Sequence, residues 1–242
     1  MGQILMALKG RLAVVTGGTR GIGRAITERL LADGAEVVAT GRHIAGEVPR
    51  NARYEGVDCE VPEQVEAFSR KLAELKPDIL INNAGFNKNF PFAEIDPELF
   101  ARIQQVNVTA PFRFSQAVLE GMRMRKWGRI VGISSIFGMI SKEHRASYSA
   151  SKFALDGMMT ALAAEVAADG ILVNCVAPGF TETDMTRAAL GEKGIAELVA
   201  RVPIRRMAQP EEIAAFTAWL AGPENTYISG QIIAIDGGFT RV

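Results

Sequence analysis

A tyrosine and a lysine four positions apart, Tyr148 and Lys152, are the residues whose types and spacing most clearly suggest chemistry. On a helix, residues i and i+4 share a face, so the lysine ammonium can stand close to the tyrosine phenol. A free phenol has a pKa near 10, and lowering it by about 3 units takes roughly 4 kcal/mol of differential stabilisation. Two nearby positive charges in a partly desolvated cleft can supply that energy. The pair predicts a general acid and base for neutral pH, and Ser135, after an earlier apolar run, could stabilise an oxyanion.

A glycine-rich loop is the second candidate site. It reads Thr16-Gly17-Gly18-Thr19-Arg20-Gly21-Ile22-Gly23 and lies between an apolar run and a segment of helical period. Glycine lets the backbone turn sharply and lets a phosphate approach it, and free amides at a helix N-terminus bind anions. A glycine cluster by itself can be only a tight turn, but this setting favours a dinucleotide pyrophosphate site.

The end of the next apolar run indicates which dinucleotide binds. A site for NAD normally carries a carboxylate here, which accepts hydrogen bonds from the ribose 2′-hydroxyl, but Gly41 occupies that place and Arg42 follows. A carboxylate would repel a 2′-phosphate, whereas the guanidinium groups of Arg42 and Arg20 could bind it. The sequence favours NADP(H), with NAD(H) as the alternative.

These residues must be positioned by a regular framework, and the chain shows one. Short runs of Val, Ile, Leu and Ala alternate with longer segments of helical period, which is typical of a parallel sheet with helices on both faces. We predict an α/β Rossmann fold with a doubly wound sheet of about seven strands. The predicted strands are 12–16, 37–40, 52–57, 79–82, 130–134, 172–177 and 232–235, and the predicted helices are 22–32, 62–75, 97–124, 148–168 and 210–220.

Composition limits the possible partners. The 242 residues suit one domain, 1–242, and Lys plus Arg equal Asp plus Glu at 27 each, so no net field attracts nucleic acid or anionic lipid. No apolar run approaches the roughly twenty residues that span a bilayer, so we expect a cytoplasmic protein that acts on small molecules. We expect no metal site, and a reduced, buried thiol at Cys175.

The chain resembles the classical short-chain dehydrogenases/reductases over nearly its whole length. The resemblance implies hydride transfer between a nicotinamide and a ketone or secondary alcohol, and usually a homotetramer built on the segments 97–124 and 148–168. The matching motifs are TGxxxGxG at Thr16 to Gly23, NNAG at Asn82 to Gly85, the helix asparagine Asn107, the catalytic residues Ser135, Tyr148 and Lys152, the PG turn Pro178-Gly179 and the closing turn Asp236-Gly237-Gly238.

The resemblance also implies roles for single residues. Asn107 would hold a water that links Lys152 to solvent, and Lys152 would bind the nicotinamide ribose. Asp58 would meet the adenine, and Thr181 and Thr183 would contact the nicotinamide amide and the pyrophosphate. The remaining cofactor contacts implied in this way are Asn83, Ala84, Gly85, Pro178 and Gly179.

The segments around 175–187 and 232–238 look most like 3-oxoacyl-[acyl-carrier-protein] reductases, which implies reduction of a 3-oxoacyl thioester. Two departures stand against this. Lys126 fits a basic position at the active-site mouth that docks the acidic carrier, but Asp169 stands where an arginine is common. Arg145 replaces a common glutamine three residues before Tyr148, and it could bind a substrate anion, turn to solvent, or pair with Glu143.

The stretch 181–207 is expected to be a lid over the substrate. Phe137 and Met185 are candidate apolar contacts in the pocket that it closes. One alternative function is an NAD(H)-dependent dehydrogenase of a small hydroxy acid, sugar or cyclic alcohol, and another is a non-catalytic cofactor-binding regulator. A nucleotide-sugar epimerase or dehydratase would need a further substrate domain, for which 242 residues leave no room.

Overall fold

Seven short segments, most of them apolar, pair side by side into one sheet, and all neighbouring strands are parallel. The computed structural model describes residues 7–242, apart from the side chains of residues 184, 185 and 188–190. The strand order is β3-β2-β1-β4-β5-β6-β7, which confirms the predicted fold class. The strands are β1 (Leu12–Val15), β2 (Glu36–Gly41), β3 (Arg53–Gly56), β4 (Ile79–Asn82), β5 (Gly128–Ile133), β6 (Ile171–Pro178) and β7 (Ile232–Ile235).

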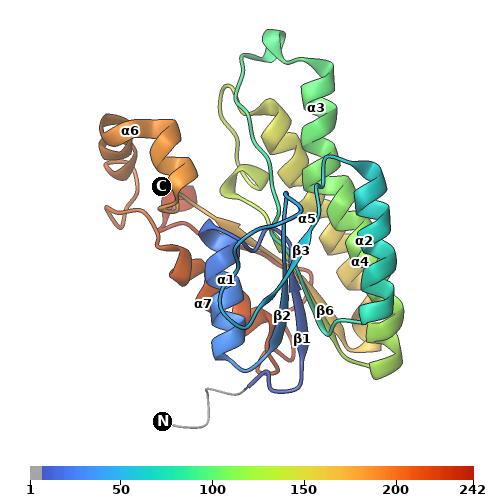
Figure 1. Cartoon of the computed structure of the whole chain (residues 1–242). Helices are drawn as coiled ribbons and strands as arrows, with labels where there is room; N and C mark the ends of the chain where they lie inside the picture. Colours follow the sequence, from blue (N-terminus) through green and yellow to red (C-terminus); the bar gives the residue numbers. More distant parts are fainter. Residues whose placement is uncertain (1–6) are drawn as a thin grey trace.

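Helices cover both faces of the sheet (Figure 1). The helices α1 (Gly21–Ala32) and α7 (Pro210–Ala221) pack on one face. On the other face lie α2 (Pro62–Leu75), α4 (Ala110–Arg125) and α5 (Ala146–Val166). Successive strand residues serve the two cores alternately, as Val14 faces one core and Ala13 and Val15 face the other. Each Val, Leu or Ile buried in this way contributes about 1.5–3 kcal/mol, so every strand except the polar edge strand β3 is mainly apolar.

The predicted helix 97–124 is not continuous. It consists of α3 (Pro97–Gln104), a π-helical turn (Gln105–Thr109) and α4. In the π-turn, the Ala110 N–H donates to the carbonyl of Gln105, five residues back. Pro111 has no N–H to offer the carbonyl of Asn107, which is the bond that a regular helix would need here.

The segment 181–207 contains a helix that the sequence analysis did not predict, α6 (Asp184–Val199). Gly191, with φ at +63°, interrupts its helical backbone. The predicted helix 148–168 begins earlier, at Ala146, and ends at Val166 in a 3₁₀ turn (Ala167–Asp169).

The chain reverses direction across the sheet between β1 and β4, which are neighbours although two strands separate them in sequence. In sheets of this kind ligands bind beyond the carboxyl ends of the strands at such a switch point. The glycine-rich loop follows β1 and the Asn83 segment follows β4, so the fold brings both candidate motifs to that position. No helix in the described part of the chain is long and apolar enough to cross a membrane, and Cys59 and Cys175 are both buried and unpaired.

Candidate active site

Tyr148 and Lys152 lie in the first turns of α5, one turn apart. The Lys152 Nζ is 5.6 Å from the centroid of the Tyr148 ring, which places the ammonium beside the phenol as the spacing predicts. Lys152 is buried, and its Nζ donates a 2.8 Å hydrogen bond to the carbonyl of Ile133 at the end of β5. This bond fixes the ammonium at the carboxyl edge of the sheet.

Ser135 follows β5 and begins a 3₁₀ turn (Ile136–Gly138). Its Oγ accepts a 3.2 Å hydrogen bond from the Phe137 N–H, so its own hydrogen remains available to a substrate oxygen. The Phe137 ring lies edge-on to the Tyr148 ring, with 6.5 Å between the centroids. Phe137 thereby connects the serine segment to the start of α5. It lies next to Tyr148, which is where a substrate contact is expected.

Asn107 is buried in the π-turn, and its side chain is fully used in holding two segments together. Its Oδ1 accepts from the Phe86 N–H at 2.8 Å, and its Nδ2 donates to the Phe86 carbonyl and to the Ser151 Oγ, both at 2.9 Å. A Cβ on Gly85 would lie 3.7 Å from both the Asn107 Oδ1 and the Lys152 Nζ. Asn107, Lys152 and the Gly85 backbone therefore meet at one point, where Asn107 anchors the loop that follows β4.

The glycine-rich loop has the shape of a phosphate cradle. A Cβ on Gly23 would lie 2.2 Å from the Gly17 carbonyl oxygen, so no larger residue fits, and Gly17 and Gly21 have positive φ angles of +65° and +52°. The helix α1 begins at Gly21, and Arg20 before it gives no side-chain cap. The first amides of α1 are therefore free to bind an anion. Thr19 lies within this loop with its methyl group beside Gly41, and Ile22, in the first turn of α1, packs against the core.

Thr16 and Asn83 tie this loop to the segment after β4. The Thr16 Oγ1 accepts from the N–H groups of Asn83 and Ala84, both at 3.0 Å. The Asn83 Nδ2 donates to the carbonyls of Thr16 and Gly17 at 2.9 and 3.1 Å. These bonds hold the glycine-rich loop against the segment after β4, so Thr16 and Asn83 shape the crevice at the switch point.

At the far end of the loop, Arg42 is held by acidic groups. Its Nε donates to Asp58 and its Nη2 pairs with Glu60, each at 3.1 Å. The sequence analysis placed Arg42 and Asp58 at the adenosine end, and the structure brings them together, but with Arg42 already engaged. Glu60 also pairs with Arg102. Arg20 is exposed and makes no ion pair within the described residues.

Tyr54 is a residue at this end that the sequence analysis missed. A Cβ on Gly41 would lie 2.8 Å from the Tyr54 hydroxyl and 2.8 Å from the Thr19 methyl group. Since Tyr54 fills this space, an acidic side chain cannot be placed at position 41 without displacing it. Tyr54 on β3 is far from Gly41 in sequence, and only the parallel pairing of β2 with β3 brings the two together.

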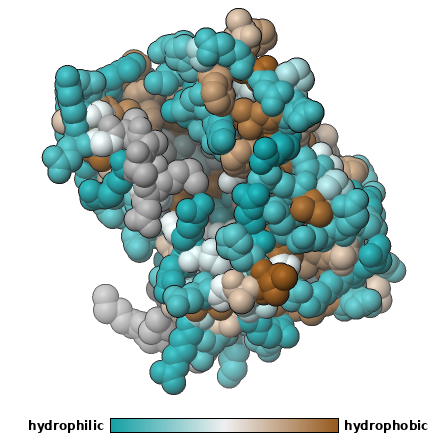
Figure 2. Space-filling model, turned by 45° about the horizontal axis from the view of Figure 1, so that its top comes forward, coloured by the Kyte–Doolittle hydropathy of each residue, from teal (hydrophilic) through white to brown (hydrophobic). Residues whose placement is uncertain are grey.

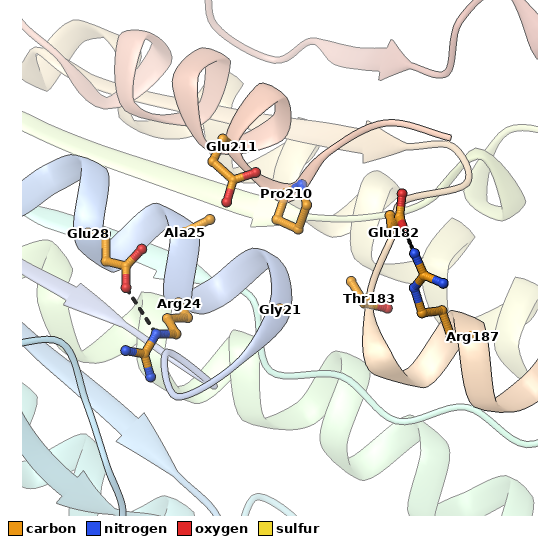
Figure 3. Close-up of a pocket in the computed structure, with 9 residues that line it drawn as sticks. All are labelled: Gly21, Arg24, Ala25, Glu28, Glu182, Thr183, Arg187, Pro210 and Glu211. Atoms are coloured by element: carbon orange, nitrogen blue, oxygen red, sulfur yellow. Dashed lines mark hydrogen bonds and ion pairs between the residues drawn. The ribbon is translucent and has the colours of Figure 1, made fainter. Parts of the chain in front are cut away.

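The residues after β6 border the same crevice. The Gly179 N–H bonds to the Ile235 carbonyl at 2.8 Å, Pro178 ends β6, and Thr181 is buried. Thr183 begins α6, and its methyl group lies 3.4 Å from where a Cβ of Gly21 would be. A cavity of about 290 Å³ lies here, between the start of α1 and the segment that leads into α6 (Figure 3). Met185 belongs to α6, but its side chain lies outside the described part of the structure.

Asp156 is a buried carboxyl group that the sequence analysis did not single out. It follows Lys152 by one helical turn, and a Cβ on Gly138 would lie 2.3 Å from its Oδ2, so it packs under the turn after Ser135. Both its oxygens lack a well-formed hydrogen bond within the described residues. Burial raises the pKa of Asp156 to about 6, although Ser134, Cys175 and Lys152 nearby lower it in part.

Lys126 and Asp169, considered above for docking a carrier, do not flank this site. They precede β5 and β6, so they lie at the amino edge of the sheet, opposite Tyr148. Asp169 is bound by both Lys126 and Arg123 at 3.0 Å. Hydrogen bonds from Lys126 and Arg123 hold the pKa of Asp169 below its usual value. Because Lys126 and Arg123 neutralise its charge, Asp169 repels an acidic partner less than an unpaired carboxylate would.

Comparison with known proteins agrees with this geometry. The sequence model of the enoyl-(acyl carrier protein) reductase family matches residues 17–240. The 3-oxoacyl-[acyl-carrier-protein] reductase of Vibrio cholerae is 39% identical, over 98% of this chain and 100% of that protein. A 3alpha-hydroxysteroid dehydrogenase of Mediterraneibacter gnavus is 37% identical, over 97% of this chain and 98% of that protein.

Solved structures show the same architecture. A candidate NAD(P)-dependent gluconate 5-dehydrogenase from Beutenbergia cavernae, with bound NADP, superimposes with a TM-score of 0.91 at 34% identity, covering 97% of this chain and 98% of that one. A candidate gluconate dehydrogenase from Agrobacterium tumefaciens has a TM-score of 0.89 at 31% identity, covering 99% and 100%. The chain belongs to the short-chain dehydrogenase/reductase family and is an oxidoreductase that acts on CH–OH and C=O groups with a nicotinamide cofactor.

Proposed function

We propose that this chain is an NADP(H)-dependent reductase of a ketone, or dehydrogenase of the corresponding secondary alcohol, with Tyr148 as its general acid and base. The observation that carries the proposal is the meeting of Tyr148, Lys152 and Ser135 at the end of β5. The Lys152 ammonium is 5.6 Å from the Tyr148 ring centroid and is held by the Ile133 carbonyl. A hydroxyl that a fixed cation faces in this way is suited to exchange a proton with the substrate oxygen.

When bound, the nicotinamide supplies or accepts the hydride. In reduction, the Tyr148 hydroxyl donates its proton to the substrate oxygen, and the Lys152 ammonium stabilises the phenolate that remains. The Ser135 hydroxyl donates to the same oxygen, because the Phe137 N–H already occupies its acceptor side. In oxidation, Tyr148 removes the alcohol proton by the same path in reverse.

Lys152 and Asn107 would return a proton to Tyr148 from solvent. The Asn107 side chain has no spare donor for a water, because its amide hydrogens bond to Phe86 and Ser151. Its main-chain carbonyl, which Pro111 cannot satisfy, is the acceptor that we assign to the relay. We therefore propose that the relay passes through the main-chain carbonyl of Asn107 and that the Asn107 side chain serves as an anchor.

We propose that the crevice at the switch point binds NADP(H). The loop from Thr16 to Gly23 and the free amides of α1 would hold the pyrophosphate, and Arg20 and Arg42 would hold the 2′-phosphate. Tyr54 fills the space beside Gly41. An acidic side chain, which would favour NAD(H), therefore does not fit at position 41. The other contacts that we propose are Asp58 for the adenine, Asn83, Ala84 and Gly85 for the adenosine side, Lys152 for the nicotinamide ribose, and Pro178, Gly179, Thr181 and Thr183 toward the nicotinamide and pyrophosphate.

For the substrate, the relatives support a 3-oxoacyl group, and residues 181–207 would close over it. A second candidate is an NAD(H)-dependent dehydrogenase of a hydroxy acid or sugar. It is supported by the two carboxylates that already occupy Arg42 and by the gluconate dehydrogenases among the structural neighbours. The ratio of kcat/KM with NADPH to that with NADH separates the two candidates, since a 2′-phosphate site gives a ratio well above one.

The proposal is tested with Tyr148→Phe, which removes only the hydroxyl. We expect kcat to fall by about 100- to 10,000-fold, which is the usual contribution of general acid and base catalysis. Binding of NADPH, followed by its fluorescence, should change by less than about threefold. Tyr227→Phe, at a tyrosine that is 95% exposed, is the matched control and should leave kcat unchanged. If Tyr148→Phe kept full turnover, the assignment of Tyr148 would be wrong.

A further inference from the structure

Arg145 lies directly beside the proposed acid and base. It precedes α5 and stands three residues before Tyr148. Its Cζ is 4.9 Å from the centroid of the Phe137 ring, and that ring in turn lies edge-on to Tyr148 and to Phe180. A cation above an aromatic face is attracted by the negative face of the ring, so Phe137 holds the guanidinium in place. Arg145 is thus held over the ring that contacts Tyr148.

The guanidinium is half-buried and lacks an acidic partner within the described part of the chain. Glu143, which could have neutralised it, is exposed and makes no ion pair with it there. Burial lowers the pKa of Arg145, and the nearby Tyr148 only partly offsets this. Partial burial of a charge without a counter-ion is unfavourable, so an anion that binds there would be stabilised.

The surroundings of Arg145 form a cavity of suitable charge. Its volume is about 410 Å³, and it lies between the loop at Asn89, Phe90 and Pro91 and the segment that leads into α5. Lys142 and His144 line it together with Arg145, against one acid, Glu143. The face of the molecule in Figure 2 is mainly hydrophilic, with apolar patches between the polar side chains. The two cations at the cavity attract a small anion.

The segment that carries Arg145 is also held firmly against α5. The hydroxyl groups of Ser141 and Ser149 are 2.7 Å apart and share a hydrogen bond across the turn. The Ser149 N–H donates to the Arg145 carbonyl at 2.8 Å, which starts the helix. A cation that is fixed by its backbone and by Phe137 loses little freedom on binding, so it can discriminate between substrates.

We infer that Arg145 binds a carboxylate of the substrate, so the ketone reduced beside Tyr148 is that of an oxo acid and the alcohol oxidised is that of a hydroxy acid. The inference rests on the proposed function and selects a free oxo acid over a 3-oxoacyl thioester as the substrate. Arg145 pairs with the carboxylate in a bidentate manner, Phe137 supports the guanidinium, and Lys142 raises the local concentration of the anion.

The test uses matched substrates that differ only in charge. Rates are measured with NADPH on 3-oxo acids of four to eight carbons and on their methyl esters, for wild type, Arg145→Gln and Arg145→Lys. We expect wild type to prefer the acids at least tenfold in kcat/KM. Arg145→Gln should lose about 10- to 100-fold on the acids, mainly through KM, and less than threefold on the esters, because a charge-assisted contact is lost. Arg145→Lys should be intermediate.

Arg53→Gln is the control for loss of a positive charge, because Arg53 is exposed at the start of β3. It should leave both rates unchanged. Equal loss on acids and esters in Arg145→Gln, or no loss on either, would overturn the inference while leaving the proposed function intact. Failure of wild type to reduce any ketone with NADPH or NADH would instead overturn the proposed function. In that case thermal shifts with 3-hydroxybutyrate and its methyl ester test Arg145 directly, and a shift that is equal in wild type and Arg145→Gln overturns the inference as well.

Discussion

The buried carboxyl of Asp156 makes the stability of the folded protein depend on pH. Its pKa is raised from 3.8 to about 6 by burial, so the folded protein keeps the proton in a range where the unfolded chain has lost it. Below pH 4 both states hold the proton, and above pH 6 neither does. Between these values stability falls as pH rises, by about 3 kcal/mol for a shift of about 2 units.

Asp156→Asn should remove this dependence, because an amide stays neutral at every pH. We expect the free energy of unfolding of wild type, relative to Asp156→Asn, to fall by about 2 kcal/mol between pH 4 and pH 7. Urea unfolding at several pH values in this range measures it. Asp96→Asn, at the exposed N-terminal cap of α3, makes the same change of charge and is the control. Parallel pH profiles for wild type and Asp156→Asn would contradict the raised pKa of Asp156 in the folded protein.

At the residue scale, the sequence predicted well those groups that act locally. Tyr148 and Lys152 are one helical turn apart, so their sequence spacing already determines their proximity. The partners of Arg42 could not be predicted in this way, because Asp58 and Glu60 come from a segment beyond β3. The same holds for Tyr54, which reaches Gly41 only through the pairing of β2 with β3. Contacts that depend on the order of the strands in the sheet cannot be predicted from the local sequence pattern.

At the scale of elements, the strands were predictable because strands covered on both faces are apolar throughout. The π-turn was not, because apolar residues continue through it at helical spacing, at Ile103, Val106, Ala110 and Phe114. The turn changes which way Asn107 points without interrupting the apolar stripe. The helix α6 was missed for a different reason, since its Ala and Gly content gives no clear amphipathic period.

Pro111→Ala tests whether the π-turn positions the site. The new N–H would offer the Asn107 carbonyl a helical partner, so α3 and α4 could join in one regular helix. We expect kcat to fall at least tenfold, because the anchor from Asn107 to Phe86 and Ser151 would move, while the thermal midpoint stays the same or rises. Pro97→Ala, at the first position of α3, is the matched control and should leave kcat unchanged. A variant that kept full kcat would show that the π-turn is dispensable.

At the scale of the whole molecule, α4 and α5 carry large apolar side chains on their outer surfaces. Phe112 is 47% exposed and Phe153 is 49% exposed, although both helices pack against the sheet on their inner faces. Exposed aromatic residues on two long helices are typical of a surface that another protein chain covers. This supports the homotetramer that we propose from the family resemblance, with α4 and α5 at one of its interfaces.

Replacing both residues by glutamate, in Phe112→Glu/Phe153→Glu, should split this interface by placing charges in it. A tetramer with two kinds of interface would then fall to dimers through the one that remains. Size-exclusion chromatography with light scattering measures the mass at several concentrations. Phe92→Glu, at a position 81% exposed before α3, adds the same kind of charge outside these helices and should leave the mass unchanged. If the double variant had the mass of wild type, α4 and α5 would not form the interface, and their exposed aromatic residues would need another partner.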